Sequence, residues 1–375
     1  MRTYWLAAKR LSSFWQTPIL VVLFRMLAAR VFFNRGPQEF DEYRFTRKSI
    51  RRWVEFIAPA ERVRLQAASA PLCSRKFEED KLLFADYCRA NALPHVPVLA
   101  VVSNKELNYR YPPGVARIDS PDALADTFRR LGSFDGFAKP IASGKGLGVQ
   151  PFQVRGGALV STPPLPDSTA MFDQFVQSSL PGKGYVIQPM VRAHAQLRCV
   201  MPGPGLGTLR VVTFLQPDQS VHIALAVLKI PAPDAPCDDE RLGAQLVEVD
   251  LSTGYLLDAV GTTQDAGVTH VVPVHVETGH RFFGTQLPYW EETRALVTRA
   301  ARAFCMLPAL GWDIAITDDG PLLLEANWRF SAVFYEQCRD RGWAEELRRL
   351  FASIAVPKPP ETEEEGTAPA DRGME

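Results

Sequence analysis

Cysteine is scarce in this sequence, and the six cysteines that it contains show no pattern of a structural site. They are scattered along the chain without a CxxC pair, and no histidine stands beside them at the spacing of zinc ligands. This distribution excludes a dense disulfide framework and a zinc finger. It favours a reducing compartment, so we predict a cytoplasmic protein.

Net charge is also missing, because 42 basic residues balance 42 acidic ones. A protein that binds nucleic acid through its phosphates needs an excess of positive charge on one surface. We therefore expect no nucleic-acid partner. Any electrostatic contribution to function must come from local groups of charges.

Long apolar runs are absent as well. The run over residues 18–24 (PILVVLF) ends at Arg25, whereas a helix that crosses a bilayer needs about 20 apolar residues. The sequence thus predicts no transmembrane span. The amphipathic pattern continues beyond Arg25 and favours a docked or membrane-surface helix over a cleaved signal peptide. Peripheral membrane contact through residues 1–60 stays open.

Composition and periodicity divide what is present into five parts. They are a basic helical region, a helix-strand segment, a part with a glycine-rich loop, a part with two hairpins, and an acidic Pro-rich tail that we expect to be disordered. Their bounds are residues 1–70, 71–120, 121–192, 193–356 and 357–375. Helices are predicted over residues 76–90, 121–132, 171–177 and 288–307, and hairpins over 208–230 and 311–328.

A glycine-rich loop follows a predicted strand that ends at Lys139. Its sequence, SGKGLG over residues 143–148, can turn backbone N–H groups toward phosphate oxygens, with Lys139 and Lys145 supplying positive charge. No Ser or Thr follows Lys145 as in a P-loop, and a strand rather than a helix comes next, unlike a dinucleotide fingerprint. The loop therefore predicts a phosphate site of another kind, with a purely structural tight turn as the alternative.

Three oxygen-bearing side chains are predicted to meet on the last hairpin. Alternation places Glu325 and Asn327 on one face of a strand, and the hairpin brings Asp313 alongside them. Mg²⁺ that bridges nucleotide phosphates would compensate the cost of such a cluster in an apolar strand. The alternative is a hydrogen-bonded cluster at a sheet edge.

The order of these motifs resembles that of the ATP-grasp superfamily. Four stretches carry the resemblance: DKLLFADYCRANALPHVP, FAKPIASGKGLGV, GYVIQPMV, and the hairpin sequences TLRVVT, ALAVLKI, GWDIAI and LLLEANW. The finer motifs LGTLRVV, VDLSTG, HVETG, LPYWEE and GWDIAI, in that order, are similar to the sugar-transfer-associated ATP-grasp subfamily. The resemblance implies an α+β fold, in which two α+β subdomains grip ATP between antiparallel sheets, here with an N-terminal helical extension.

The resemblance also implies roles for particular residues. Asp313, Glu325 and Asn327 would ligate Mg²⁺, with two ions expected and Mn²⁺ as a substitute, and Arg210 and Lys229 would contact phosphate or acyl-phosphate. Residues expected to bind ATP are Lys81, Lys139, Ser143, Gly144, Lys145, Gly146, Gly148, Gln188, Pro189, Met190 and Val191. We add Arg329 as a candidate that binds a substrate carboxylate bidentately, with a surface ion pair as its alternative.

The predicted activity is an ATP- and Mg²⁺-dependent ligation of small-molecule carboxylate and amine substrates through an acyl-phosphate. It would serve polysaccharide, cell-envelope or secondary-metabolite biosynthesis. Two alternatives remain: a kinase of the same fold that phosphorylates a hydroxyl group, and a nucleotide-binding scaffold without turnover. His275 and His280 lie in a polar loop that could border the substrate, although a solvated loop is the simpler interpretation.

Overall fold

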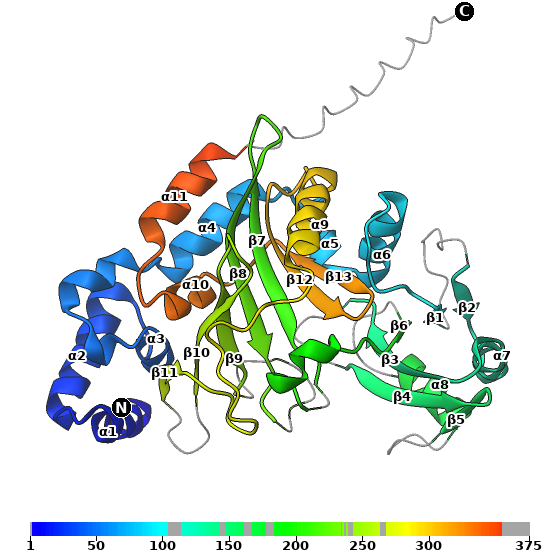
Figure 1. The fold of residues 1–375 in the computed structure, drawn as a ribbon, viewed down its shortest axis with the longest axis horizontal. Coiled ribbons are helices and arrows are strands. Elements are labelled where there is room, and N and C mark those ends of the chain that lie inside the picture. The colour runs from blue at the N-terminus through cyan, green and yellow to red at the C-terminus, as the bar shows by residue number, and fades with distance from the viewer. Residues whose placement is uncertain are drawn as a thin grey trace, which may run out of the picture.

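The structure is a computed structural model of the 375-residue chain. It describes residues 2–103, 114–142, 148–160, 167–177, 184–203, 205–233, 235, 238, 243–262 and 268–354. Helices and two sheets make up an α+β architecture, with the N-terminal helices at one end and the smaller sheet at the other (Figure 1). The predicted disordered tail, residues 357–375, lies outside the described residues.

The N-terminal region is helical, as predicted. Its elements are α1 (Arg2–Trp15), α2 (Ile19–Phe33), α3 (Pro37–Glu42), α4 (Pro59–Ser69) and the short 3₁₀ helices η1 (Phe45–Arg47) and η2 (Ile50–Glu55). Aromatic packing joins η1 to η2, because the Phe45 ring centroid lies 4.9 Å from that of Trp53 and 5.0 Å from that of Phe56. In the part of the chain that the structure describes, no helix has the length and apolarity to cross a membrane.

The helix predicted over residues 76–90 is in fact two helices, which corrects the sequence-based expectation. They are α5 (Lys76–Glu79) and α6 (Lys81–Ala90), and Asp80 between them has an extended backbone. The Asp80 carboxylate accepts hydrogen bonds from the Leu82 and Leu83 amides at 3.1 and 3.0 Å, so it caps the second helix. Lys81 consequently begins a helix. Its amide donates to the carbonyl of Ile141, two residues after Lys139, which stands before the predicted glycine-rich loop.

A six-stranded sheet forms the smaller part of the molecule. Its strands are β1 (Ala100–Val102), β2 (Ala116–Ile118), β3 (Phe134–Pro140), β4 (Gln150–Arg155), β5 (Ala158–Val160) and β6 (Tyr185–Pro189), in the spatial order β2-β1-β6-β3-β4-β5. Helices α7 (Pro121–Leu131) and α8 (Ser168–Gln177) supply its apolar partners, with Phe128 packed against Phe152. The helix predicted over residues 121–132 is present as α7, which Ser120 caps and which Gly132 ends at a positive φ.

A seven-stranded antiparallel sheet forms the larger part. Its strands are β7 (Thr208–Leu215), β8 (Val221–Ile230), β9 (Gln245–Val249), β10 (Leu256–Thr262), β11 (Thr269–Val272), β12 (Ala309–Thr317) and β13 (Gly320–Asn327), in the order β11-β10-β9-β8-β7-β12-β13. Both predicted hairpins are present, whereas sequence reasoning did not find β9 to β11. The remaining elements are the 3₁₀ helix η3 (Ala195–Cys199) and helices α9 (Trp290–Ala303), α10 (Val333–Cys338) and α11 (Ala344–Ser353).

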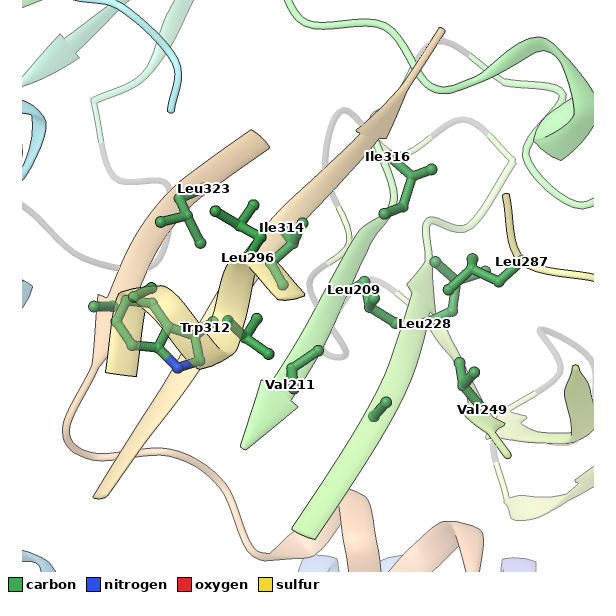
Figure 2. Close-up of a cluster of buried hydrophobic side chains, with 14 of the residues drawn as sticks. Leu209, Val211, Leu228, Val249, Leu287, Leu296, Trp312, Ile314, Ile316 and Leu323 are labelled. Carbon is green, nitrogen blue, oxygen red and sulfur yellow. The ribbon is translucent and has the colours of Figure 1, made fainter. Parts of the chain in front are cut away.

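The two faces of the large sheet pack on different helices. Leu209 and Val211 of β7 face a core that includes Leu296 of α9 (Figure 2). Val212 and Phe214 belong to the cluster that contains residues of α10 and α11. Because side chains alternate along a strand, Arg210 shares this second face. The fold thus separates a largely apolar face from one that carries charged residues.

Candidate active site

Three charged residues lie in one row across neighbouring strands. Arg210 of β7 is the register partner of Asp313 of β12, which in turn is the partner of Glu325 of β13. The Arg210 guanidinium donates from Nε to Asp313 Oδ1 at 2.5 Å and from Nη2 to Oδ2 at 2.8 Å. Both side chains are buried, so this bidentate pair is largely removed from solvent.

Two cations hold Asp313 in its ionised form. Burial alone would raise its pKa, but the nearby Arg210 and Lys229 charges outweigh burial and keep the pKa well below the ordinary value. Lys229 Nζ lies 3.5 Å from Asp313 and 3.3 Å from Oδ2 of Asp238. Burial lowers the pKa of Lys229, yet these carboxylates raise it overall. The group is therefore a buried network of alternating charges.

Glu325 adds a second carboxylate beside Asp313. Its pKa is raised, first by burial and then by the negative charge of Asp313. Asn327 Nδ2 donates to Glu325 Oε1 at 3.0 Å, which confirms that the two side chains share one face of β13. Two neighbouring carboxylates and an amide are hard oxygen donors of the kind that Mg²⁺ prefers.

These donors fit a magnesium ion that takes part of its coordination from another molecule. Within the described ranges, no three Asp, Glu, His or Cys side chains stand close enough to hold a metal by themselves. Mg²⁺ commonly completes a site of one or two carboxylates with water and substrate phosphates. Asp313, Glu325 and Asn327 are such a partial set.

Two lysines approach Glu325 from the other side. Lys139 stands at the end of β3, and its pKa is lowered to about 8 by burial and by repulsion from Lys81, with Glu325 acting in the opposite direction. Burial also lowers the pKa of Lys81, while Glu325 and Asp80 raise it. Main-chain hydrogen bonds join β13 to the segment that leads from α6 to β1, since the Leu323 amide donates to Pro94 O and the Val96 amide donates to Leu323 O. Positive charge from β3 and the start of α6 thus faces the negative charge of Glu325 on β13.

Much of the predicted phosphate loop lies outside the described residues. This applies to Ser143, Gly144, Lys145 and Gly146. Gly148 is described and has a φ of +73°, a conformation that favours glycine. The loop's role in phosphate binding stays a prediction, for which Lys139 provides the one described cation.

Four of the residues expected to bind ATP, residues 188–191, run from the end of β6 into the chain that follows it. Gln188 Nε2 donates to Val96 O at 3.3 Å, so this side chain serves the packing of the sheet. Pro189 has no amide hydrogen, and the Met190 amide donates to Asp135 O at 2.8 Å. If Pro189 and Met190 contact adenine through their main chain, they would therefore use their carbonyl oxygens. Val191 follows beyond the end of the strand.

Arg329 forms a surface ion pair, which was the alternative to its predicted role in binding a substrate carboxylate. Its Nη2 and Nε donate to Glu78 Oε1 at 3.1 and 3.3 Å, and 54% of its side chain is exposed.

The two candidate histidines also have local hydrogen-bond partners. His275 is buried, contrary to the expectation of a solvated loop, and its Nδ1 accepts from the Glu277 and Thr278 amides. His280 Nε2 lies 2.8 Å from Thr285 Oγ1.

Sequence reasoning missed two residues of the site. Asp238 pairs with Lys229 and accepts from the Thr208 amide at 3.0 Å, but nothing in its local sequence indicates this role. Gly311 has no room for a side chain, because a Cβ would lie 2.6 Å from Cβ of Phe330 and 3.3 Å from Cδ of Arg210. A glycine two residues before Asp313 in an apolar strand was the available signal.

Comparison with known sequences agrees with this geometry. A profile of the family described as sugar-transfer associated ATP-grasp matches residues 62–350. The chain therefore belongs to this family and has the ATP-grasp fold, as the motifs predicted. No curated protein matches the sequence significantly.

Solved structures of similar shape include several ATP-grasp enzymes. A biotin carboxylase complex from Campylobacter jejuni has a TM-score of 0.42 and 11% identity, over 76% of this chain and 48% of that one. N5-carboxyaminoimidazole ribonucleotide synthetase from Thermus thermophilus has a TM-score of 0.42 and 13% identity, over 80% and 60%. D-alanyl-alanine synthetase A from Vibrio cholerae has 0.39 and 13%, over 73% and 64%. The chain thus spans between about half and two thirds of each of these proteins.

Proposed function

We propose that this protein is an ATP- and Mg²⁺-dependent ligase that joins a small-molecule carboxylate to an amine. The observation that carries the proposal is the row Arg210, Asp313 and Glu325, which faces Lys139 of the other sheet. Family membership supports ATP as the nucleotide. In this proposal the nucleotide lies between residues 121–192 and 193–356, and segment 71–120 precedes them.

Asp313, Glu325 and Asn327 are the residues that would hold Mg²⁺. When bound, the ion or ion pair would offset the charge of the ATP phosphates, and Mn²⁺ could replace it. Lys139 and Lys81 would bind phosphate oxygens from the side of the small sheet. Arg210 uses Nε and Nη2 for Asp313, so an anion would reach it through Nη1.

The proposed reaction needs no nucleophile from the protein. An oxygen of the substrate carboxylate attacks the γ-phosphorus of ATP, and ADP leaves. The amine nitrogen then attacks the carbonyl carbon of the acyl-phosphate, the C–O bond to phosphate breaks, and the leaving phosphate takes the proton that the amine loses as the amide forms. Positioning and the charges of Arg210, Lys229 and Lys139 would supply most of the rate enhancement.

Two other activities are possible on this geometry. A kinase would transfer the phosphoryl group to a hydroxyl and stop, and a scaffold would bind ATP without turnover. The complete donor set of Asp313, Glu325 and Asn327 favours turnover over a scaffold, because a Mg²⁺ ion held there would offset the charge of the transferring phosphoryl group. The family description favours a role in glycan or cell-envelope synthesis.

A substrate screen would distinguish these activities. The purified protein is incubated with MgATP and panels of carboxylates and amines, ADP release is measured, and products are weighed by mass spectrometry. A ligase releases ADP and forms a condensed product only when both substrates are present. A phosphorylated hydroxyl product formed without an amine would identify a kinase. Failure of millimolar MgATP to raise the melting temperature would refute nucleotide binding itself.

A further inference from the structure

Helix α2 exposes an apolar stripe to solvent. Leu20, Phe24, Leu27 and Val31 follow each other at spacings of four, three and four residues, so they form one line along the helix. Their exposed fractions are 71%, 67%, 37% and 74%. The opposite face, which carries Val22, Met26 and Ala29, is buried against the rest of the N-terminal region. The helix is therefore apolar on both faces, although only one face is covered.

Such a helix is unusual at a protein surface. Surface helices normally place charged or polar side chains opposite their buried stripe, and a helix that is apolar all round is normally buried or in a membrane. Phe32 at the end of α2 and Trp5 on α1 add further exposed apolar surface, at 77% and 49%. Water alone is thus a poor environment for the α1–α2 hairpin.

Positive charge accompanies the stripe. Residues 1–38 contain six Arg or Lys residues and no Asp or Glu, although the whole chain has no net charge. Arg25 and Arg35 are used internally, for they donate to main-chain carbonyls of Phe45 and Phe56. Arg2, Lys9 and Arg30 are exposed. Acidic residues begin at Glu39 on α3, so the stretch with basic but no acidic residues coincides with the α1–α2 hairpin that carries the apolar stripe.

We propose that the α1–α2 hairpin binds the surface of an anionic lipid bilayer, with α2 lying in the interface and its stripe among the acyl chains. At about 1.5 Å per residue, the 15 residues of α2 extend about 22 Å, so the helix can lie on a bilayer but cannot span one. Basic residues beside such a stripe attract anionic headgroups. The hairpin lies at the opposite end of the molecule from the small sheet, so that sheet would face away from the lipid (Figure 1).

A second copy of the chain is a less suitable partner for this face. Two identical faces meeting around a twofold axis would bring their positive charges together without any acidic residue from residues 1–38 to neutralise them. An anionic bilayer provides both the apolar phase and the opposite charge. The proposal concerns where the protein acts and is independent of the ligase activity.

Vesicle flotation with the full-length protein tests the proposal. The probes are vesicles of phosphatidylcholine alone and of phosphatidylcholine with phosphatidylglycerol, at low and high salt. One variant combines Leu20→Gln, Phe24→Gln and Val31→Gln, and another combines Lys9→Gln and Arg30→Gln. The matched control is Val276→Gln with Phe283→Gln, because these two apolar side chains are 64% and 56% exposed elsewhere on the molecule.

We expect the parent and the control to bind anionic vesicles and the stripe variant to lose at least tenfold in binding. The charge variant should lose roughly ten- to thirtyfold, since each basic residue near an anionic surface contributes about one kilocalorie per mole. Unchanged melting temperatures would show that the exposed substitutions leave the fold intact.

Four results would overturn the proposal. The first is a parent protein that does not bind anionic vesicles. The second is equal binding of the parent and the stripe variant. The third is a parent that is dimeric by light scattering, becomes monomeric in the stripe variant and ignores vesicles, which would assign this face to a contact between copies. Equal binding to neutral and anionic vesicles would refute the choice of an anionic surface.

Discussion

Lys139 should take up a proton when MgATP binds. Burial and repulsion from Lys81 lower its pKa to about 8, from an ordinary value of 10.5. The empty protein at pH 8 therefore carries this amine in protonated form only about half of the time. Nucleotide phosphates beside the amine would favour the charged form, so we expect an uptake of about half a proton per ATP bound at pH 8.

Titration calorimetry at pH 8, in two buffers with different ionisation enthalpies, measures this uptake directly. Lys139→Met keeps the apolar stem, removes the charge and should abolish most of the uptake. Its affinity for ATP should fall by about 1.5 to 3 kcal/mol, or roughly ten- to a hundredfold. Lys9→Met, at an exposed position on α1, is the matched control and should behave like the parent. A Lys139→Met protein that binds ATP as tightly as the parent, or a parent without proton uptake, would refute the assignment.

The same pKa shift predicts how stability depends on pH. The pKa of Lys139 is lower in the folded state than in the unfolded state, so the folded protein is destabilised by holding this amine in its charged form. This destabilisation is fully present below about pH 8, and the free energy of unfolding rises with pH between about 8 and 10.5. The full shift corresponds to at most about 3 kcal/mol. Since the Lys139 side chain remains partly accessible, we expect Lys139→Met to gain about 1 to 2 kcal/mol at pH 7. Urea unfolding should show this gain shrinking as the pH is raised toward 10.

Three further changes test other parts of the structure. Glu325→Ala or Asn327→Ala should leave the urea midpoint nearly unchanged but abolish ADP release, and near-normal turnover in either would disprove the metal assignment. Gly311→Ala should lower the free energy of unfolding by about 1 to 3 kcal/mol and reduce turnover, because the added methyl would collide with Cβ of Phe330; unchanged stability in urea would contradict the close contact. Burial raises the pKa of Glu336 to about 7, so the parent should lose stability as the pH rises from about 4.5 through 7. Glu336→Gln should flatten this dependence of the free energy of unfolding on pH. If denaturant titrations at several pH values give the same dependence for the parent and for Glu336→Gln, Glu336 is excluded as the cause.

The sequence by itself determined the local elements that carry the proposed metal site. Apolar alternation on both sides of an Asp-Asp-Gly turn predicted the β12–β13 hairpin, and the two-residue period placed Glu325 and Asn327 on one face. Gly320 at the turn has a φ of +112°, which explains why a glycine stands there. These features depend on neighbours in the chain, so a sequence pattern is sufficient to reveal them.

Only the tertiary structure decided which charges meet. Arg210 and Asp313 are 103 residues apart in sequence and pair because β7 and β12 are neighbours in the sheet. The break at Asp80 likewise depends on a distant partner, since the Lys81 amide donates to the carbonyl of Ile141. An amphipathic pattern cannot encode such contacts, because each depends on where a remote strand lies. The exposed stripe of α2 shows the same limit: the sequence marks these residues as apolar, but only packing decides which of them remain uncovered.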